Sequence, residues 1–401
     1  MTGRFSVARS TILIVLLFWF AAGWGGCLRS DMRQSRQAPA AVGLPRPVRA
    51  VWVARFHYRY ADDIRTIMKN CRRLGFNTVL WQVRGNGTTA YPSSIEPWAK
   101  EFDHRDPGFD PLALAVSEAH KQGLRIEAWV NVLPGWRGPK PPPIRSQLYH
   151  ARPEWFMYDA EGRRQPLDKF YAIINPCLPE VRRYLVSVFR EIVTKYDVDG
   201  LHLDYVRYAW ETTPRAKQIY PRDPATLALY RRDTGKHPDD DSRAWDRWRA
   251  DRLTQLVASI REMLGRERPD ASLTAAVTPD PALAYSRYHQ SGADWLAAGL
   301  LDAVMPMTYV PELQRLERYV QAYKQAGRVI PGLGVYKLDH GQFREQLRRC
   351  EQWGGDLAAF SYTSFHATAD NRGAPLGPHE QTLRADRRRA IQSSLGGYAV
   401  E

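Results

Sequence analysis

Four polar residues, each at or just past the carboxyl end of a β-rich segment, could form one reactive site: Arg84, Asn131, Asp204 and Asp280. Side chains alternate between the two faces of a strand, and the apolar neighbours of these residues suit a face that packs on helices. The four polar side chains would then share the opposite face, where they are costly to bury unless they bind a ligand. Two carboxylic acids can divide the roles of proton donor and nucleophile or base. We therefore predict Asp204 and Asp280 as a catalytic pair.

Structural roles remain as alternatives for both carboxylates. Asp204 could form an ion pair with Arg84 or Arg207, and Arg84 could equally lower the pKa of a catalytic Asp204. Asp280 lies in a Pro-Asp-Pro sequence, which is typical of a turn. Glu154 is then the substitute for Asp280 as the second acid.

His202 and Glu127 are expected one or more layers deeper on the same inward faces. His202 fits a hydrogen-bonded core histidine better than a metal ligand, because the sequence has no HExxH motif or other compelling ligand spacing. Glu127 could be the buried partner of an arginine. No metal or other cofactor is predicted, and a metal-dependent hydrolase such as a deacetylase stays as a minor alternative.

These residues depend on a regular alternation of elements from residue 50 onward. The predicted strands are Ala50–Phe56, Thr78–Arg84, Arg125–Val132, Val198–Tyr205, Ser272–Thr278, Asp302–Tyr309, Val329–Tyr336 and Leu357–Tyr362. Helical patterns between them include Asp62–Leu74, Pro111–Gln122, Glu180–Lys195 and Trp245–Leu264. Eight such strands predict an α/β fold with a parallel sheet closed as a (β/α)8 TIM barrel. The connections after the third and fourth strands, 133–197 and 206–271, are long, and such loops build the active sites of this fold.

The two long connections supply aromatic side chains: Trp136, Trp155, Phe156, Tyr158, Tyr171, Tyr208 and Trp210. Rigid aromatic faces beside polar groups suit a sugar ring, which has apolar C–H faces and a rim of hydroxyls. Several of these residues could instead only pin a long loop to the barrel.

The N-terminal residues are typical of an export signal. Residues 1–26 combine two arginines, a short apolar run and small residues before Cys27, which predicts a lipoprotein-type signal with lipidation at Cys27. Ordinary cleavage or an uncleaved anchor is the alternative. Residues 27–46 are polar and rich in proline and alanine, as in a tether. We expect the barrel domain over 47–385, a C-terminal tail over 386–401, and a membrane-anchored protein of the cell envelope that faces the periplasm.

The chain is basic, with 57 Lys and Arg against 43 Asp and Glu and a formal net charge of +14. No long Lys/Arg block marks a nucleic-acid tail, so an anionic polymer or membrane surface is the expected partner and nucleic acid is not. The four cysteines show no CxxC spacing, so the sequence supports neither a zinc ribbon nor a disulfide framework.

Several segments resemble the glycosyl hydrolase-like 10 family of bacterial envelope proteins. The matching segments are RAVWVARF at 49–56, LGFNTVLWQVRGNGTTAYPS at 74–93, GLRIEAWVNVLPG at 123–135, NPCLPEVRRYLVSVFREIVTKYDVDGLHLDYVRY at 175–208 and LDAVMPMTY at 301–309. The resemblance implies a barrel that acts on glycans such as peptidoglycan strands. It also carries over a set of site residues: Arg84, Asn131, His202, Asp204, Tyr205 and Arg207. Many relatives have an acidic residue within 86–89, where this chain reads Asn-Gly-Thr-Thr.

Together these observations predict an envelope glycoside hydrolase that cleaves glycosidic bonds of a bacterial polysaccharide with paired carboxylates. In this hypothesis Asp204 is the nucleophile or essential carboxylate and Asp280 its acid partner. The predicted substrate-binding residues are Arg84, Asn131, His202, Tyr205, Arg207, Trp136 and Tyr309. A non-catalytic glycan-binding lipoprotein that uses the same barrel mouth is the rival reading.

Overall fold

The computed structural model describes residues 43–208, 220–369 and 377–396. The chain divides into two compact units, Met1–Ala40 and Ala41–Glu401, and all described residues belong to the second. The predicted export signal, Cys27 and the loop aromatic Trp210 therefore lie outside the described residues. In the ranges described, no helix is both long and apolar enough to cross a bilayer.

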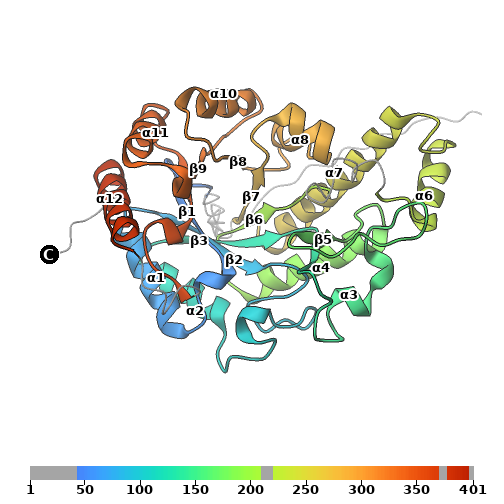
Figure 1. Ribbon diagram of the computed structural model, residues 1–401, viewed down its shortest axis with the longest axis horizontal. Helices are drawn as coiled ribbons and strands as arrows, with labels where there is room; N and C mark the ends of the chain where they lie inside the picture. The colour runs from blue at the N-terminus through green and yellow to red at the C-terminus, as the bar shows by residue number, and fades with distance from the viewer. Residues whose placement is uncertain (1–42, 209–219, 370–376, 397–401) are drawn as a thin grey trace, which may run out of the picture. The chain divides into compact units, whose positions relative to one another are not determined.

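Eight parallel strands close into a barrel, as predicted (Figure 1). They are β1 Arg49–Val53, β2 Thr78–Arg84, β3 Arg125–Asn131, β6 Gly200–Asp204, β7 Ser272–Val277, β8 Ala303–Thr308, β9 Gly332–Gly334 and β10 Leu357–Phe360. Around the barrel they follow the order β1-β10-β9-β8-β7-β6-β3-β2. Each of the eight segments predicted from sequence overlaps one strand of the barrel, and β1 begins one residue before its predicted segment. The segment predicted as 329–336 forms only three strand residues, because a short 3-10 helix, Val335–Lys337, follows the second of its two glycines.

Helices cover the outside of the ring of strands (Figure 1). The larger ones are α1 Ala61–Arg73, α2 Pro111–Lys121, α4 Pro179–Lys195, α7 Ser242–Glu267, α10 Leu313–Lys324, α11 His340–Gln352 and α12 Pro378–Leu395. The other α-helices are α3 Leu148–Ala151, α6 Pro224–Thr234, α8 Pro281–Tyr288 and α9 Gly292–Ala297. Apolar strand residues that face outward, such as Val51, Val79 and Leu203, are fully buried against these helices. The burial of this interface is the main stabilising contribution to the fold.

A second, two-stranded sheet follows β3. In it, β4 Pro134–Arg137 pairs antiparallel with β5 Tyr171–Ile173, and the register places Arg137 opposite Tyr171. Neither strand was predicted, since three or four residues are too few to show an alternating pattern. The pair gives the long connection after β3 a fixed framework beside the carboxyl ends of the barrel strands.

The two ends of the described domain are both part of the fold. Arg328 donates hydrogen bonds to the carbonyl oxygens of Leu44 and Pro45 and forms an ion pair with Asp356 at 2.9 Å. These contacts fasten the start of the domain to the amino-terminal end of the barrel, beneath β9 and β10. At the other end of the chain, helix α12 runs to Leu395, so the segment predicted as a tail from residue 386 begins inside a helix.

Candidate active site

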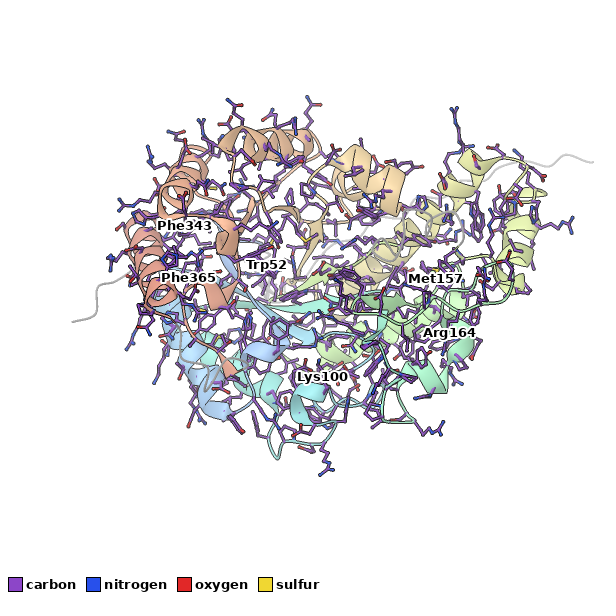
Figure 2. All side chains as sticks on the ribbon, in the orientation of Figure 1. Trp52, Lys100, Met157, Arg164, Phe343 and Phe365 are labelled. Carbon is purple, nitrogen blue, oxygen red and sulfur yellow. The ribbon has the colours of Figure 1, made fainter. Side chains whose placement is uncertain are left out.

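A cavity of about 210 Å³ opens at the carboxyl ends of the barrel strands. Its lining residues are Trp52, Ala54, Arg55, Phe56, Gln82, Trp129, Asn131, Arg137, Tyr171, Asp204, Tyr205, Ala276, Met307, Tyr309 and Phe360. The floor is formed by inward side chains of the strands, among them Trp52, which lies inside the ring of strands (Figure 2). We refer to this cavity as the mouth pocket. Of the predicted site residues, it brings together Asp204, Asn131, Tyr205 and Tyr309.

Asp204 ends β6 and is the carboxylate of the mouth pocket. Only 5% of the residue is exposed, and burial raises the pKa of its carboxyl group to about 6. Three groups oppose this rise by favouring the charged form: the Arg207 guanidinium, the Tyr205 backbone N–H and the Trp129 indole. The N–H of Tyr205 donates to Oδ1 of Asp204 at 2.7 Å. The carboxyl group thus accepts a backbone hydrogen bond and lies near a positive charge, an arrangement that favours its ionised form.

The backbone of Tyr205 makes this arrangement possible. Its φ of +51° lies in the left-handed region, which residues other than glycine rarely adopt. Strain of this kind clusters at functional sites, where surrounding contacts hold it in place. The turn directs the Tyr205 N–H back to Asp204 while the Tyr205 ring lines the mouth pocket.

Two amide side chains form the wall beside Asp204. Gln82 donates to Oδ1 of Asn131 at 3.1 Å, and Asn131 in turn donates to the Gly85 carbonyl oxygen at 3.0 Å and to the Tyr171 hydroxyl at 3.3 Å. The Gln82 oxygen accepts from the backbone and the guanidinium of Arg55. These bonds fix the amide orientations in advance of any ligand.

Aromatic rings form the opposite wall. Tyr309 stacks on Phe360 with 5.2 Å between the ring centroids, and Phe360 lies 5.9 Å from the Trp52 ring. Burial raises the pKa of Tyr309, so its hydroxyl stays protonated and can donate a hydrogen bond. An apolar wall facing amides and a carboxylate matches the two faces of a sugar ring.

Arg84 does not reach Asp204, contrary to the prediction. A register shift lies between Gln82 and Arg84 on β2. The Arg84 guanidinium pairs with both oxygens of Glu96, at 2.7 to 3.1 Å, and donates to the carbonyl oxygens of Asn131 and Val132. Both charges are fully buried. This residue therefore ties the loop after β2 to the end of β3, and Arg207 is the arginine that lowers the pKa of Asp204.

Asp280 and Trp136 make contacts that stabilise a helix end and a loop. The Asp280 side chain caps α8 by accepting from the backbone N–H groups of Ala282 and Leu283 at 3.0 and 3.1 Å. This is the turn role that its Pro-Asp-Pro sequence allowed. Trp136 is buried and donates to the Lys140 carbonyl oxygen, which pins the loop after β3. Glu154, the substitute acid, is exposed on a short 3-10 helix, and none of these three residues lines the mouth pocket.

His202 lies beneath the mouth pocket and not on its surface. Its Nε2 accepts from the Trp52 indole at 3.0 Å, and its Nδ1 lies 2.9 Å from the Thr274 hydroxyl, which donates to Glu127. Burial lowers the pKa of His202 to about 3 and raises the pKa of Glu127 to about 7. The partners of Glu127 are thus hydroxyl groups rather than an arginine. Among the described residues, no group of three or more His, Cys, Asp and Glu could hold a metal ion.

Sequence reasoning did not assign a site role to Trp52, Arg55, Arg137 or Phe360. The first could have been found, because Val51 and Val53 face the helices and alternation then turns Trp52 inward. The position of Arg137 depends on the β4–β5 pairing, which left no usable signal in the sequence.

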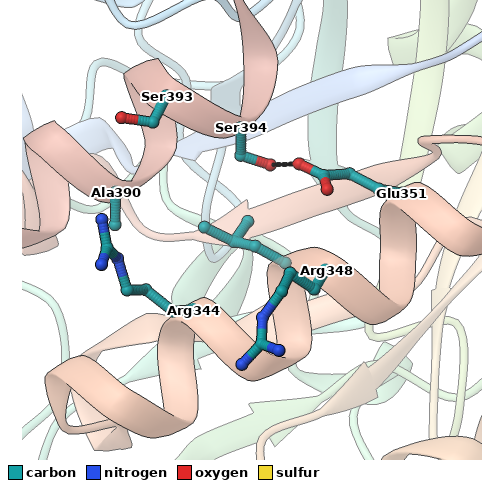
Figure 3. Close-up of a pocket in the computed structure, with 7 residues that line it drawn as sticks. Arg344, Arg348, Glu351, Ala390, Ser393 and Ser394 are labelled. Atoms are coloured by element: carbon teal, nitrogen blue, oxygen red, sulfur yellow. Dashed lines mark hydrogen bonds between the residues drawn. The ribbon is translucent and has the colours of Figure 1, made fainter.

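A second hollow, of about 340 Å³, lies between α11 and α12 on the outside of the barrel. It is lined by Arg344, Leu347, Arg348, Glu351, Ala390, Ser393 and Ser394. The Ser394 hydroxyl donates to Glu351 (Figure 3). Its two arginines are exposed and it has no buried polar group to orient a ligand, so the mouth pocket remains the candidate site.

A parallel (β/α)8 barrel with a pocket at the carboxyl ends of its strands is the architecture of TIM-barrel enzymes. The chain belongs to the glycosyl hydrolase-like 10 family, which matches residues 47–345. It is 28% identical over 274 residues to the glycosyl hydrolase DigH of Escherichia coli strain K12, covering 63% of this chain and 58% of that protein. It is 26% identical over 266 residues to the glycosyl hydrolase YngK of Bacillus subtilis strain 168, covering 61% and 48%. The matched part thus spans less than two thirds of either relative.

Solved structures confirm the fold. The glycoside hydrolase domain of PgaB (BpsB) from Bordetella bronchiseptica superposes with a TM-score of 0.61 at 15% identity, covering 84% of this chain and 98% of that domain. Alpha-L-fucosidase isoenzyme 2 from Paenibacillus thiaminolyticus gives the same TM-score at 13% identity, covering 87% and 50%. At such identities the likeness extends to the architecture alone.

Proposed function

We propose that the protein is a glycoside hydrolase of the bacterial cell envelope that cleaves glycosidic bonds in a polysaccharide, with peptidoglycan glycan strands as the substrate class. The observation that carries the proposal is the position of Asp204, a buried carboxyl group between fixed amides and an aromatic wall at the barrel mouth. Family membership supports the same reaction class.

In this proposal Asp204 acts in its ionised form, as the nucleophile or as the carboxylate that stabilises a developing positive charge on the sugar. Its contacts with the Tyr205 N–H and with Arg207 favour that form. Asn131 and Gln82 would hold substrate hydroxyls, while the Tyr309 and Phe360 rings would face the C–H side of the sugar. The basic surface would suit an anionic cell-wall polymer. Lipidation of Cys27 would hold the protein in the envelope membrane, facing the periplasm.

The test compares two matched variants, Asp204→Asn and Asp280→Asn, on purified peptidoglycan glycan strands with products read by mass spectrometry. Asp204→Asn should lower the cleavage rate by at least about a thousandfold, because an amide can neither attack carbon nor carry the required charge. Asp280→Asn should stay within about twofold of wild type, since asparagine caps a helix as well as aspartate does. Near-normal cleavage by Asp204→Asn would contradict the assignment. A comparable loss in both variants would restore the pair predicted from sequence.

A non-catalytic glycan-binding protein is the second candidate. It is favoured by one observation: among the described lining residues of the mouth pocket, Asp204 is the single carboxylate, whereas most glycosidases use two. Strands that stay intact but still sediment with the wild-type protein would establish this reading.

A further inference from the structure

Two neighbouring tyrosine rings of the mouth pocket, Tyr205 and Tyr171, lie between two arginines, Arg207 and Arg137. The guanidinium carbon of Arg207 lies 4.7 Å from the centre of the Tyr205 ring, the Tyr205 and Tyr171 rings are 4.9 Å apart, and the guanidinium carbon of Arg137 lies 5.5 Å from the Tyr171 ring. This row of side chains runs from the side of Asp204 to the rim, where Arg137 ends β4. We refer to it as the Arg–Tyr ladder.

The positive charges of this region differ in how far they are neutralised. Arg55 is buried, pairs with Glu101 at 3.3 Å and donates to Gln82, so its charge already has an internal partner. Arg207 is buried beside Asp204, whose pKa it lowers. Arg137 is exposed, and no carboxylate pairs with it in the part of the chain that the structure describes.

Two contacts nevertheless orient the Arg137 guanidinium. Its Nε donates to the Lys169 carbonyl oxygen at 3.1 Å, and the Tyr171 ring supports the guanidinium from below. Because Nε is occupied, the two terminal nitrogens are the donors left for a ligand. A pair of such donors in a plane matches a carboxylate, which an arginine binds through two parallel hydrogen bonds.

We propose that Arg137 is a specificity-determining residue that binds a carboxylate of the glycan at the rim of the mouth pocket, next to the sugar that contacts Asp204. This inference rests on the proposed function and narrows its substrate class to glycans that carry an acidic sugar near the scissile bond. Two sources share this chemistry: the lactyl carboxylate of a peptidoglycan strand without stem peptides, and the carboxylate of a uronic acid.

The experiment uses the purified protein, Arg137→Ala, Arg137→Lys and the control Arg344→Ala. Arg344 is exposed on α11 in the outer hollow, so its removal deletes one positive charge without touching the mouth pocket (Figure 3). The substrates are glycan strands without stem peptides, the same strands with their carboxylates converted to amides, and a uronic-acid polymer. Cleavage rates are fitted for KM and kcat separately.

Arg137→Ala should raise KM for the acidic strands about tenfold, with kcat within about twofold, because one charge-assisted contact is lost in the bound state. On the amidated strands Arg137→Ala and wild type should behave alike, and Arg137→Lys should recover part of the loss by charge alone. Arg344→Ala should match wild type throughout. The polymer that shows the larger effect identifies the source of the carboxylate.

If the wild type cleaves acidic and amidated strands with the same KM, the inference is overturned while the glycosidase proposal stays intact. The inference is also overturned if Arg137→Ala still has a lower KM for acidic strands than for amidated strands. If the wild type cleaves none of the substrates, the glycosidase proposal fails, and titration calorimetry with the same polymers then decides in the same terms whether Arg137 sets a preference for acidic glycans.

Discussion

The Asp204 carboxyl group should govern the pH dependence of the reaction. Burial raises its pKa to about 6, so the ionised form that the proposed reaction needs is lost as the pH falls through 6. We expect kcat/KM to be level above about pH 7 and to fall about tenfold per pH unit well below 6. Rates measured between pH 4 and 8 check this.

Glu127 provides the control, since it is a second buried carboxyl among the described residues whose pKa is raised, to about 7, and it lies beneath the mouth pocket. Glu127→Gln should leave the acidic limb in place. If kcat/KM instead falls as the pH rises above 6, Asp204 acts as the proton donor.

At the scale of the strand, β6 and β7 approach each other closely at Gly200. Gly200 pairs with Ser272, and a Cβ at Gly200 would lie 2.3 Å from the Ser272 hydroxyl and 2.7 Å from its carbonyl oxygen. We expect Gly200→Ala to lower the free energy of unfolding by about 1–3 kcal/mol, because backbone atoms must move apart.

The matched control is Gly265→Ala in α7, where a Cβ would have nothing within 4 Å. Alanine is favoured over glycine inside a helix, so this variant should gain about 0.5–1 kcal/mol. Chemical unfolding of the two variants beside wild type measures both values. A loss in Gly265→Ala, or none in Gly200→Ala, would show that the packing differs from this description.

The elements show what the sequence can predict. Alternation of apolar residues located all eight barrel strands and turned Asn131 and Asp204 inward, because this pattern is local and repeats along each strand. The same alternation misplaced Arg84, since a register shift between Gln82 and Arg84 interrupts it. For Asp280 the sequence left two roles open, because helix capping and catalysis both favour an aspartate just after a strand, and the structure shows the capping bonds. The rim residue Arg137 depends on a pairing between segments more than thirty residues apart.

At the scale of the whole domain, the amino-terminal end of the barrel anchors the start of the domain, whereas the opposite end forms the mouth pocket. Arg328 and Asp356 hold residues 44–48 at the amino-terminal end of the barrel, where the Val48 N–H donates to Asp356 at 2.6 Å. Arg328→Gln should speed hydrogen exchange at the Val48 amide, because Asp356 loses its cationic partner. Exchange at Leu203 in β6 and the rate of glycan cleavage should stay close to wild type. Loss of cleavage would show that the two ends of the barrel are coupled.

Residues 44–48 also determine which end of the barrel carries the attachment point when the domain is immobilised at Leu44. They meet the barrel beneath β9 and β10, whereas Asp204 and Arg137 open at the opposite end. An affinity tag or a sensor surface joined directly at Leu44 is therefore attached at the end of the barrel opposite the mouth pocket. Immobilisation through this side should leave the opening accessible to polymers too long to diffuse around the domain.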